Sequence, residues 1–267
     1  MYSGKTISRQ SGKIIGVHQK IDRAARRNLN LLIKNPRSFP GIRNIIYFEG
    51  KNGPDGLKIK HAKKDIPWHF INPLDPNDKD LINMINDHIF NLAAAIRTKN
   101  EVRAAFEAAW LAHAVTDGLT PAHLKSIDNE IEKLFGHSPR DAESYLNKKL
   151  IHGKNGLDSL AKNWEYWGNG VVMSHFLFEV GVATAIASEK YKIVKPSSAD
   201  LDYLKLKGFE NTFLKSVRKI YGLKSYENFI KKGMTMDLAL EIKEVIIPEI
   251  INCVTLAWYQ AVLLSVN

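Results

Sequence analysis

The segment HAVTDGLTPAH, residues 113–123, contains three side chains that are common metal ligands. His113 and Asp117 are four residues apart, so they share one face if the segment is helical. His123 follows Asp117 by six residues, and the glycine and proline between them predict that the helix ends first. Two imidazoles and a carboxylate that converge in this way favour a transition metal such as zinc.

Three other parts of the chain contain candidate ligands. His175 and Glu179 in MSHFLFEVGV are again four residues apart. Asp55 and His69 are fourteen residues apart in PDGLKIKHAKKDIPWHF, and His18 lies near the N-terminus in GVHQKID. One predicted helix contains His18 together with Ile21 and Asp22, so a packed histidine is the alternative there.

Two other carboxylates, Glu49 and Asp65, compete with Asp55 for the role of metal ligand. Asp55 also lies in a good turn sequence, where aspartate is common for conformational reasons. The spacing between Asp55 and His69 favours Asp55 as the ligand. Trp68 and Phe70, which flank His69, are interpreted as packing residues.

The ordered set of candidate ligands resembles that of the bacterial zinc-dependent phospholipases C, whose structural relatives are the S1/P1 nucleases. The set is His18, Asp55, His69, His113, Asp117, His123, His175 and Glu179. In that family a His-x3-Asp-x5-His segment and a later His-x3-Glu supply most ligands of a three-zinc cluster, and HAVTDGLTPAH and HFLFE match them. The nucleases have Asp at the last position, so Glu179 favours the phospholipase branch.

The resemblance implies how these ligands are divided among the zinc ions. One ion would be bound by Asp55, His69, His113 and Asp117. A second ion would be bound by His123, His175 and Glu179, with positions left open for water and substrate. A third ion would share Asp117 and add His18. Asp55 would also be the catalytic residue, as the proton acceptor.

The chain departs from the family pattern in three places. The family uses the amino group and carbonyl of an N-terminal Trp for the third metal, whereas position 1 here is Met. We therefore expect two tightly held ions and a third that is weaker or absent. The 52 residues from His123 to His175 predict a helical insertion at about 124–170. The N-terminus has no apolar run of the kind that a secretion signal needs, unlike most members.

Length and composition favour one globular domain over residues 1–267. The chain has 45% hydrophobic and 25% charged residues, as is ordinary for a core-forming protein. We see no apolar stretch of about 18 residues, so we expect no transmembrane helix and a cytoplasmic location. The chain has a single cysteine, Cys253, so an intrachain disulfide is excluded. Because the S1/P1 nucleases are typically exported and stabilised by disulfides, this observation mildly disfavours them.

The positive charge is concentrated in the first quarter of the chain. Residues 1–60 contain thirteen Lys or Arg and three acids, whereas the remainder is balanced, for a net charge of +10. This basic region is a candidate contact for phosphate-bearing partners, either an anionic membrane surface or nucleic acid. The alternative is an ordinary solvated surface around an acidic metal site.

Hydrophobic periodicity predicts an all-α fold, a single multi-helical domain. We expect helices near 15–34, 79–97 and 101–118, a helix that contains His175 and runs to about 190, two or three shorter helices after 195–198, and a last helix from about 235 to 266 that bends at Pro248. Residues 38–78 are rich in Pro and Gly and predict a long functional loop. The other histidines are interpreted as surface or helix-end residues: His61, His88, His137 and His152.

These observations favour a zinc-dependent phosphodiester hydrolase that uses a zinc-activated water on a phospholipid or similar substrate. One alternative is an S1/P1-like nuclease that cleaves single strands. Another, of a different class, is a non-catalytic module that binds membrane or nucleic acid and uses zinc for structure. Structural zinc sites are usually closed by four protein ligands, so a ligand set with open positions argues against that alternative.

Overall fold

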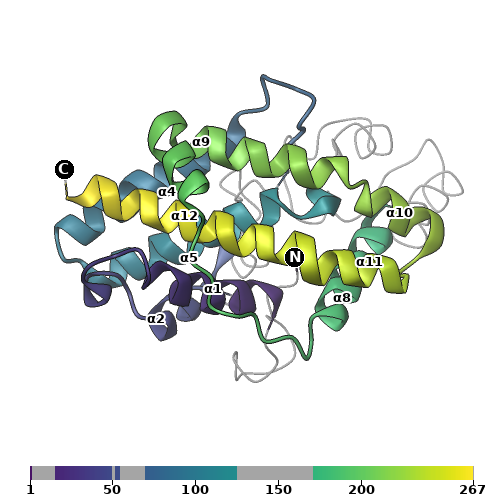
Figure 1. Ribbon diagram of the computed structural model, residues 1–267, viewed down its shortest axis with the longest axis horizontal. Helices are drawn as coiled ribbons and strands as arrows, with labels where there is room; N and C mark the ends of the chain where they lie inside the picture. The colour runs from purple at the N-terminus through teal and green to yellow at the C-terminus, as the bar shows by residue number, and fades with distance from the viewer. Residues whose placement is uncertain (2–15, 50–51, 55–69, 125–170, 267) are drawn as a thin grey trace, which may run out of the picture.

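A computed structural model describes residue 1 and residues 16–49, 52–54, 70–124 and 171–266 of the chain. The described residues are mostly helical and include no strand, which confirms the all-α class (Figure 1). The predicted insertion lies outside this part of the chain, apart from residue 124. The elements are α1 (Val17–Leu29), η1 (Pro36–Ser38), α2 (Ile42–Tyr47), α4 (Asp80–Arg97), α5 (Glu101–Gly118), η3 (Pro121–His123), α8 (Val171–Ala185), α9 (Ser198–Gly222), α10 (Ser225–Lys232), α11 (Met236–Glu241), η6 (Ile242–Ile246) and α12 (Ile247–Ser265).

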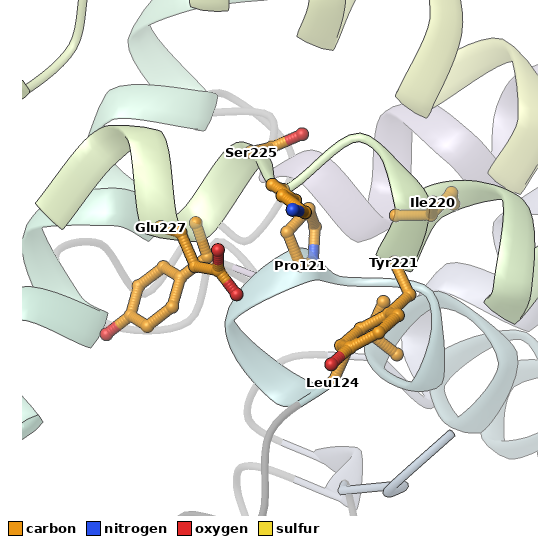
Figure 2. Close-up of a pocket in the computed structure, with 8 residues that line it drawn as sticks. Pro121, Leu124, Ile220, Tyr221, Ser225 and Glu227 are labelled. Atoms are coloured by element: carbon orange, nitrogen blue, oxygen red, sulfur yellow. The ribbon is translucent and has the colours of Figure 1, made fainter. Parts of the chain in front are cut away.

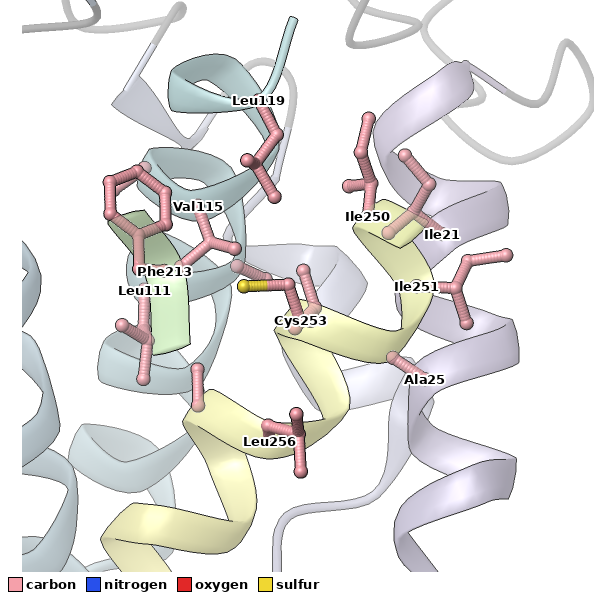
Figure 3. Close-up of a cluster of buried hydrophobic side chains, with 14 of the residues drawn as sticks. Ile21, Ala25, Leu111, Val115, Leu119, Phe213, Ile250, Ile251, Cys253 and Leu256 are labelled. Atoms are coloured by element: carbon pink, nitrogen blue, oxygen red, sulfur yellow. The ribbon is translucent and has the colours of Figure 1, made fainter. Parts of the chain in front are cut away.

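Helix α12 is the central element of the core and contacts α1, α4, α5 and α9 (Figure 1). Figure 3 shows its apolar side chains between those of α1 on one side and α5 and α9 on the other. The Trp258 indole is fully buried and donates a 2.9 Å hydrogen bond to the Ala108 carbonyl. Burial on several sides explains why α12 is apolar around most of its circumference.

The helical run 236–265 is also long and apolar enough to cross a membrane by length and composition. The core helix of a protein can pass the same test, so this finding does not contradict the expectation of no transmembrane helix. In its most apolar window, 61% of the residues are buried inside the protein, as in a core helix.

Helix α5 positions the first ligand pair and has clear local signals at both ends. The Asn100 side chain accepts a hydrogen bond from the Arg103 N–H at 3.0 Å, which caps the helix at the start expected from the sequence, near residue 101. At the other end, a Cβ on Gly118 would lie 2.5 Å from Leu81 Cδ2 and 2.7 Å from Phe213 Cζ. Glycine thus permits close packing where α5 ends, and His123 follows in η3, as the sequence predicts.

Several helix bounds differ from our expectations. Helix α1 is shorter than 15–34, and α8 ends at Ala185 rather than near 190. The shorter helices expected after residue 198 begin with one 25-residue element, α9, which kinks at Gly208 where φ is 76°. The expected bend near Pro248 is replaced by the π-helical segment η6, and Pro248 lies in the first turn of α12.

Candidate metal centre

A buried group of three predicted ligands joins α1 and α5. His18 Nε2 lies 3.2 Å from Asp117 Oδ1, and His113 Nε2 lies 3.2 Å from Asp117 Oδ2. The His18 and His113 rings stack with centroids 4.3 Å apart. Each of the three residues is at most 3% exposed, so Asp117 presents its two oxygens to different imidazoles inside the protein.

A second group of three ligands joins η3 and α8. His123 Nε2 lies 3.0 Å from His175 Nε2 and 3.6 Å from Glu179 Oε1, and the last two atoms are 3.0 Å from each other. The His175 and Glu179 side chains are 21% and 19% exposed, whereas that of His123 is 5% exposed. This group is therefore the more accessible of the two.

The accessible group has the ligand spacing of a tetrahedral divalent cation. Zinc bonds to imidazole nitrogen and carboxylate oxygen are about 2.0–2.2 Å, so adjacent ligand atoms around a tetrahedral ion lie roughly 3.3–3.6 Å apart. The three distances in the accessible group run from 3.0 to 3.6 Å, whereas the two 3.2 Å contacts in the buried group involve different oxygens of Asp117. Within each group one atom from each residue lies within 4.8 Å of the others, so His/Asp and His/Glu donors converge as the sequence predicts.

The main chain of Met1 lies between the two groups. Its amino nitrogen is 2.7 Å from Asp117 Oδ1 and 3.3 Å from Glu179 Oε1. Its carbonyl oxygen is 2.8 Å from His18 Nε2. Met1 is 3% exposed, so a positive amino group next to two carboxylates compensates charge in the interior. Composition and spacing gave no sign of this contact.

Glu49, a competing carboxylate in the sequence, contacts the other edge of His113. Both Glu49 carboxylate oxygens lie 3.3 Å from His113 Nδ1, and Glu49 is 2% exposed. Burial would lower the pKa of His113, but Glu49 and Asp117 raise it well above its usual range. Burial, followed by the charge of Glu49, raises the pKa of the nearby Asp22 carboxyl. Glu49 thus orients the imidazole from behind, as carboxylates behind metal-bound histidines do.

Protonation in the accessible group suits a metal. Burial lowers the pKa of His123 to about 4, so its imidazole is neutral at pH 7. Burial would raise the pKa of Glu179, but the Met1 amino group and hydrogen bonds from His123 and His175 hold it well below its usual range. A neutral imidazole and an ionised carboxylate are the forms that bind metal.

The turn that contains His123 is held from two sides. The Phe70 ring lies 4.9 Å from the His123 ring, and the Ile71 N–H donates to the His123 carbonyl at 3.1 Å. Phe70 is therefore next to the candidate site, where its ring packs against His123. On the other side, Pro121 and Leu124 line a small pocket with residues of the α9–α10 junction (Figure 2): Ile220, Tyr221, Lys224, Ser225, Tyr226 and Glu227.

The remaining predicted residues have different outcomes. Asp55 and His69 lie outside the described residues, as do His61, His137 and His152. His88 was wrongly interpreted as a surface or helix-end residue. It lies within α4, and its Nδ1 is 2.5 Å from Oε2 of Glu107, a fully buried carboxylate that also pairs with Arg103.

Comparison with protein-family models, with curated proteins and with solved structures finds no match to this chain.

Proposed function

We propose that this protein is a metal-dependent phosphodiester hydrolase of the kind represented by the zinc phospholipases C. The observation that carries the proposal is the contrast between the two donor groups. His18, His113 and Asp117 are buried, whereas His175 and Glu179 are about one-fifth exposed. A closed group suits a structural or supporting ion, and an open group leaves positions for substrate.

The proposed ligands combine the described donors with those implied by the resemblance. The buried group would hold one ion through His113 and Asp117, with Asp55 and His69 completing it. Glu49 would act on this ion through His113, because it contacts the opposite edge of that ring. The accessible group would hold the second ion.

A third ion would take His18, Asp117 and the main chain of Met1. This part of the proposal is supported by the Met1 amino nitrogen 2.7 Å from Asp117 Oδ1 and the Met1 carbonyl oxygen 2.8 Å from His18 Nε2, and the amino group would bind the ion after losing its proton. This part of the proposal depends on a free amino group at Met1. Adding residues ahead of Met1 is then expected to lower the number of bound ions without emptying the other two positions.

The chemistry of the site follows from the donors. When bound, zinc would polarise phosphoryl oxygens and lower the pKa of a bound water toward about 7. His123 and Glu179 contribute one neutral and one anionic donor, and Glu49 holds the His113 ring in place. Asp55 is the proposed proton acceptor.

Hydrolysis of a water-soluble chromogenic phosphocholine ester by the zinc-loaded protein tests the proposal. We expect turnover that chelation abolishes and zinc restores, and slower cleavage of single-stranded DNA. The nuclease alternative is supported by the aromatic ring of Phe70 beside His123 and His175, because bases stack on such rings. Cleavage of DNA alone would favour that alternative, and no cleavage with metals retained would favour a structural role for zinc.

A further inference from the structure

One face of α8 is apolar and exposed. Met173, Phe176, Leu177 and Val180 follow the i, i+3, i+4, i+7 spacing of a single helix face. Their exposed fractions are 36%, 54%, 50% and 40%. An apolar helix face of this width is normally buried, so its exposure indicates a surface that meets an apolar partner.

This exposed face, Met173–Val180, adjoins the accessible donor group on the same helix. His175 and Glu179 are followed directly by Phe176 and Val180, about 100° further around the helix. The opposite side of α8 is fixed in the protein, because the Phe178 ring packs against Tyr226 and Phe229 of α10 at 5.4 and 5.3 Å. A molecule that covered the exposed face would therefore contact His175 and Glu179 at the edge of that face.

Two exposed lysines and further apolar side chains lie on the helices next to α8, which also contain the acidic residues Glu227, Asp237 and Glu241. Helices α10 and α11 contact α8 and lie at the same end of the molecule (Figure 1). Helix α10 ends in the exposed residues Lys231 and Lys232. Ile230, Met236 and Leu240 are 52%, 76% and 43% exposed. Exposed apolar residues combined with lysines are typical of surfaces that enter the headgroup region of anionic bilayers.

We propose that the exposed face of α8 docks on a phospholipid bilayer and brings headgroups to the His123, His175 and Glu179 group. This inference rests on the proposed function for its substrate class. A protein partner or a second copy on this face would cover the edge of the open donor group. A lipid surface supplies apolar chains for the face, phosphates for the lysines and an ester for the donors.

The test compares two double variants by vesicle flotation. Phe176→Ser with Leu177→Ser removes the centre of the face. Phe90→Ser with Val102→Ser is the matched control, because these residues of α4 and α5 are 62% and 70% exposed. The metal-loaded proteins are mixed briefly in the cold with phosphatidylcholine vesicles, with and without phosphatidylglycerol. We expect the α8 variant to bind at least about tenfold more weakly than wild type and the control variant to bind normally.

Hydrolysis of the soluble ester is measured on the same samples. Equal turnover by wild type and the α8 variant, together with lost flotation, supports docking through this face. If neither the wild type nor the α8 variant hydrolyses the ester, but only the wild type floats with the vesicles, the proposed function fails and the docking proposal is supported. Flotation by the α8 variant equal to wild type, or no flotation of wild type, would overturn the inference. Sedimentation without vesicles measures the oligomeric state. A dimer in the wild type that becomes a monomer in the α8 variant would also overturn the inference.

Discussion

His123 Nε2 and His175 Nε2 lie 3.0 Å apart, although 52 positions separate the two residues in the chain. Their rings stack with an interplanar angle of 9° and centroids 4.7 Å apart. Two bare imidazole nitrogens repel at this distance, so the arrangement needs a proton or a cation. Glu179 adds a negative charge 3.0 Å from His175 Nε2, which stabilises either a proton or a metal cation at this place.

Replacing His175 with Ala is expected to lower hydrolysis of the soluble ester by at least about 100-fold, because it removes a donor from the open group. The protein should stay folded, since the His175 side chain is 21% exposed. Asp87→Asn, an exposed position on α4, is the control and should retain full activity. Turnover by His175→Ala close to wild type would show that this residue does not serve the reaction.

Chelation is expected to lower the melting temperature. A metal present at a hundredfold excess over its Kd stabilises the folded state by about 2.7 kcal/mol. For a chain of this size, that corresponds to roughly 5–10 °C. Differential scanning calorimetry with and without excess chelator measures the shift. An identical melting curve would mean that the clustered side chains hold no metal.

Cys253 provides a second readout of unfolding. It is 1% exposed, and burial raises the pKa of its thiol, so the reactive thiolate is suppressed in the folded protein (Figure 3). We expect a thiol reagent to modify Cys253 slowly in the metal-loaded protein and faster after chelation. Rapid modification of the metal-loaded protein would contradict the packing of α12.

His88→Ala should destabilise the protein by about 1–3 kcal/mol, because Glu107 Oε2 would lose its hydrogen-bond partner inside the protein. Asp87→Ala on the exposed side of the same helix should change stability by less than about 0.5 kcal/mol. Urea unfolding of both variants measures the difference. Equal midpoints would mean that the contact between His88 and Glu107 contributes nothing.

Gly118→Ala should destabilise the protein by about 1–3 kcal/mol and weaken metal binding, because the new methyl would press against Leu81 and Phe213 beside Asp117. Gly222→Ala is the matched control, since a Cβ there meets nothing within 4 Å. Urea unfolding and zinc titration of the two variants check this. A Gly118→Ala protein as stable as Gly222→Ala would contradict the close packing at the end of α5.

The locally encoded parts of the site could be predicted from the sequence. Hydrophobic periodicity predicted the helix near 101–118, and Asn100 caps its start. The four-residue spacings of His113 with Asp117 and of His175 with Glu179 placed each pair on one helix face. These features depend only on helical periodicity and capping. The pairing of His18 with Asp117 came instead from the resemblance to the phospholipases.

The contacts that surround the ligands could not be predicted in this way. Met1 meets Asp117 across 116 positions, and Glu49 meets His113 across 64. His88 on α4 contacts Glu107 on α5, so the two residues are not at the three- or four-residue spacing that places ligands on one helix face. Such contacts depend on how distant parts of the chain pack together. The spacing of residues along one helix holds no information about this packing.

Elemental analysis of protein purified without added metal tests the central claim most directly. We expect two tightly held divalent ions per chain, chiefly zinc, with a third that is weaker. Under the same conditions His175→Ala should lose one ion, whereas Asp87→Asn should lose none. Fewer than one ion per chain in the wild type, with no uptake when zinc is added, would contradict the account.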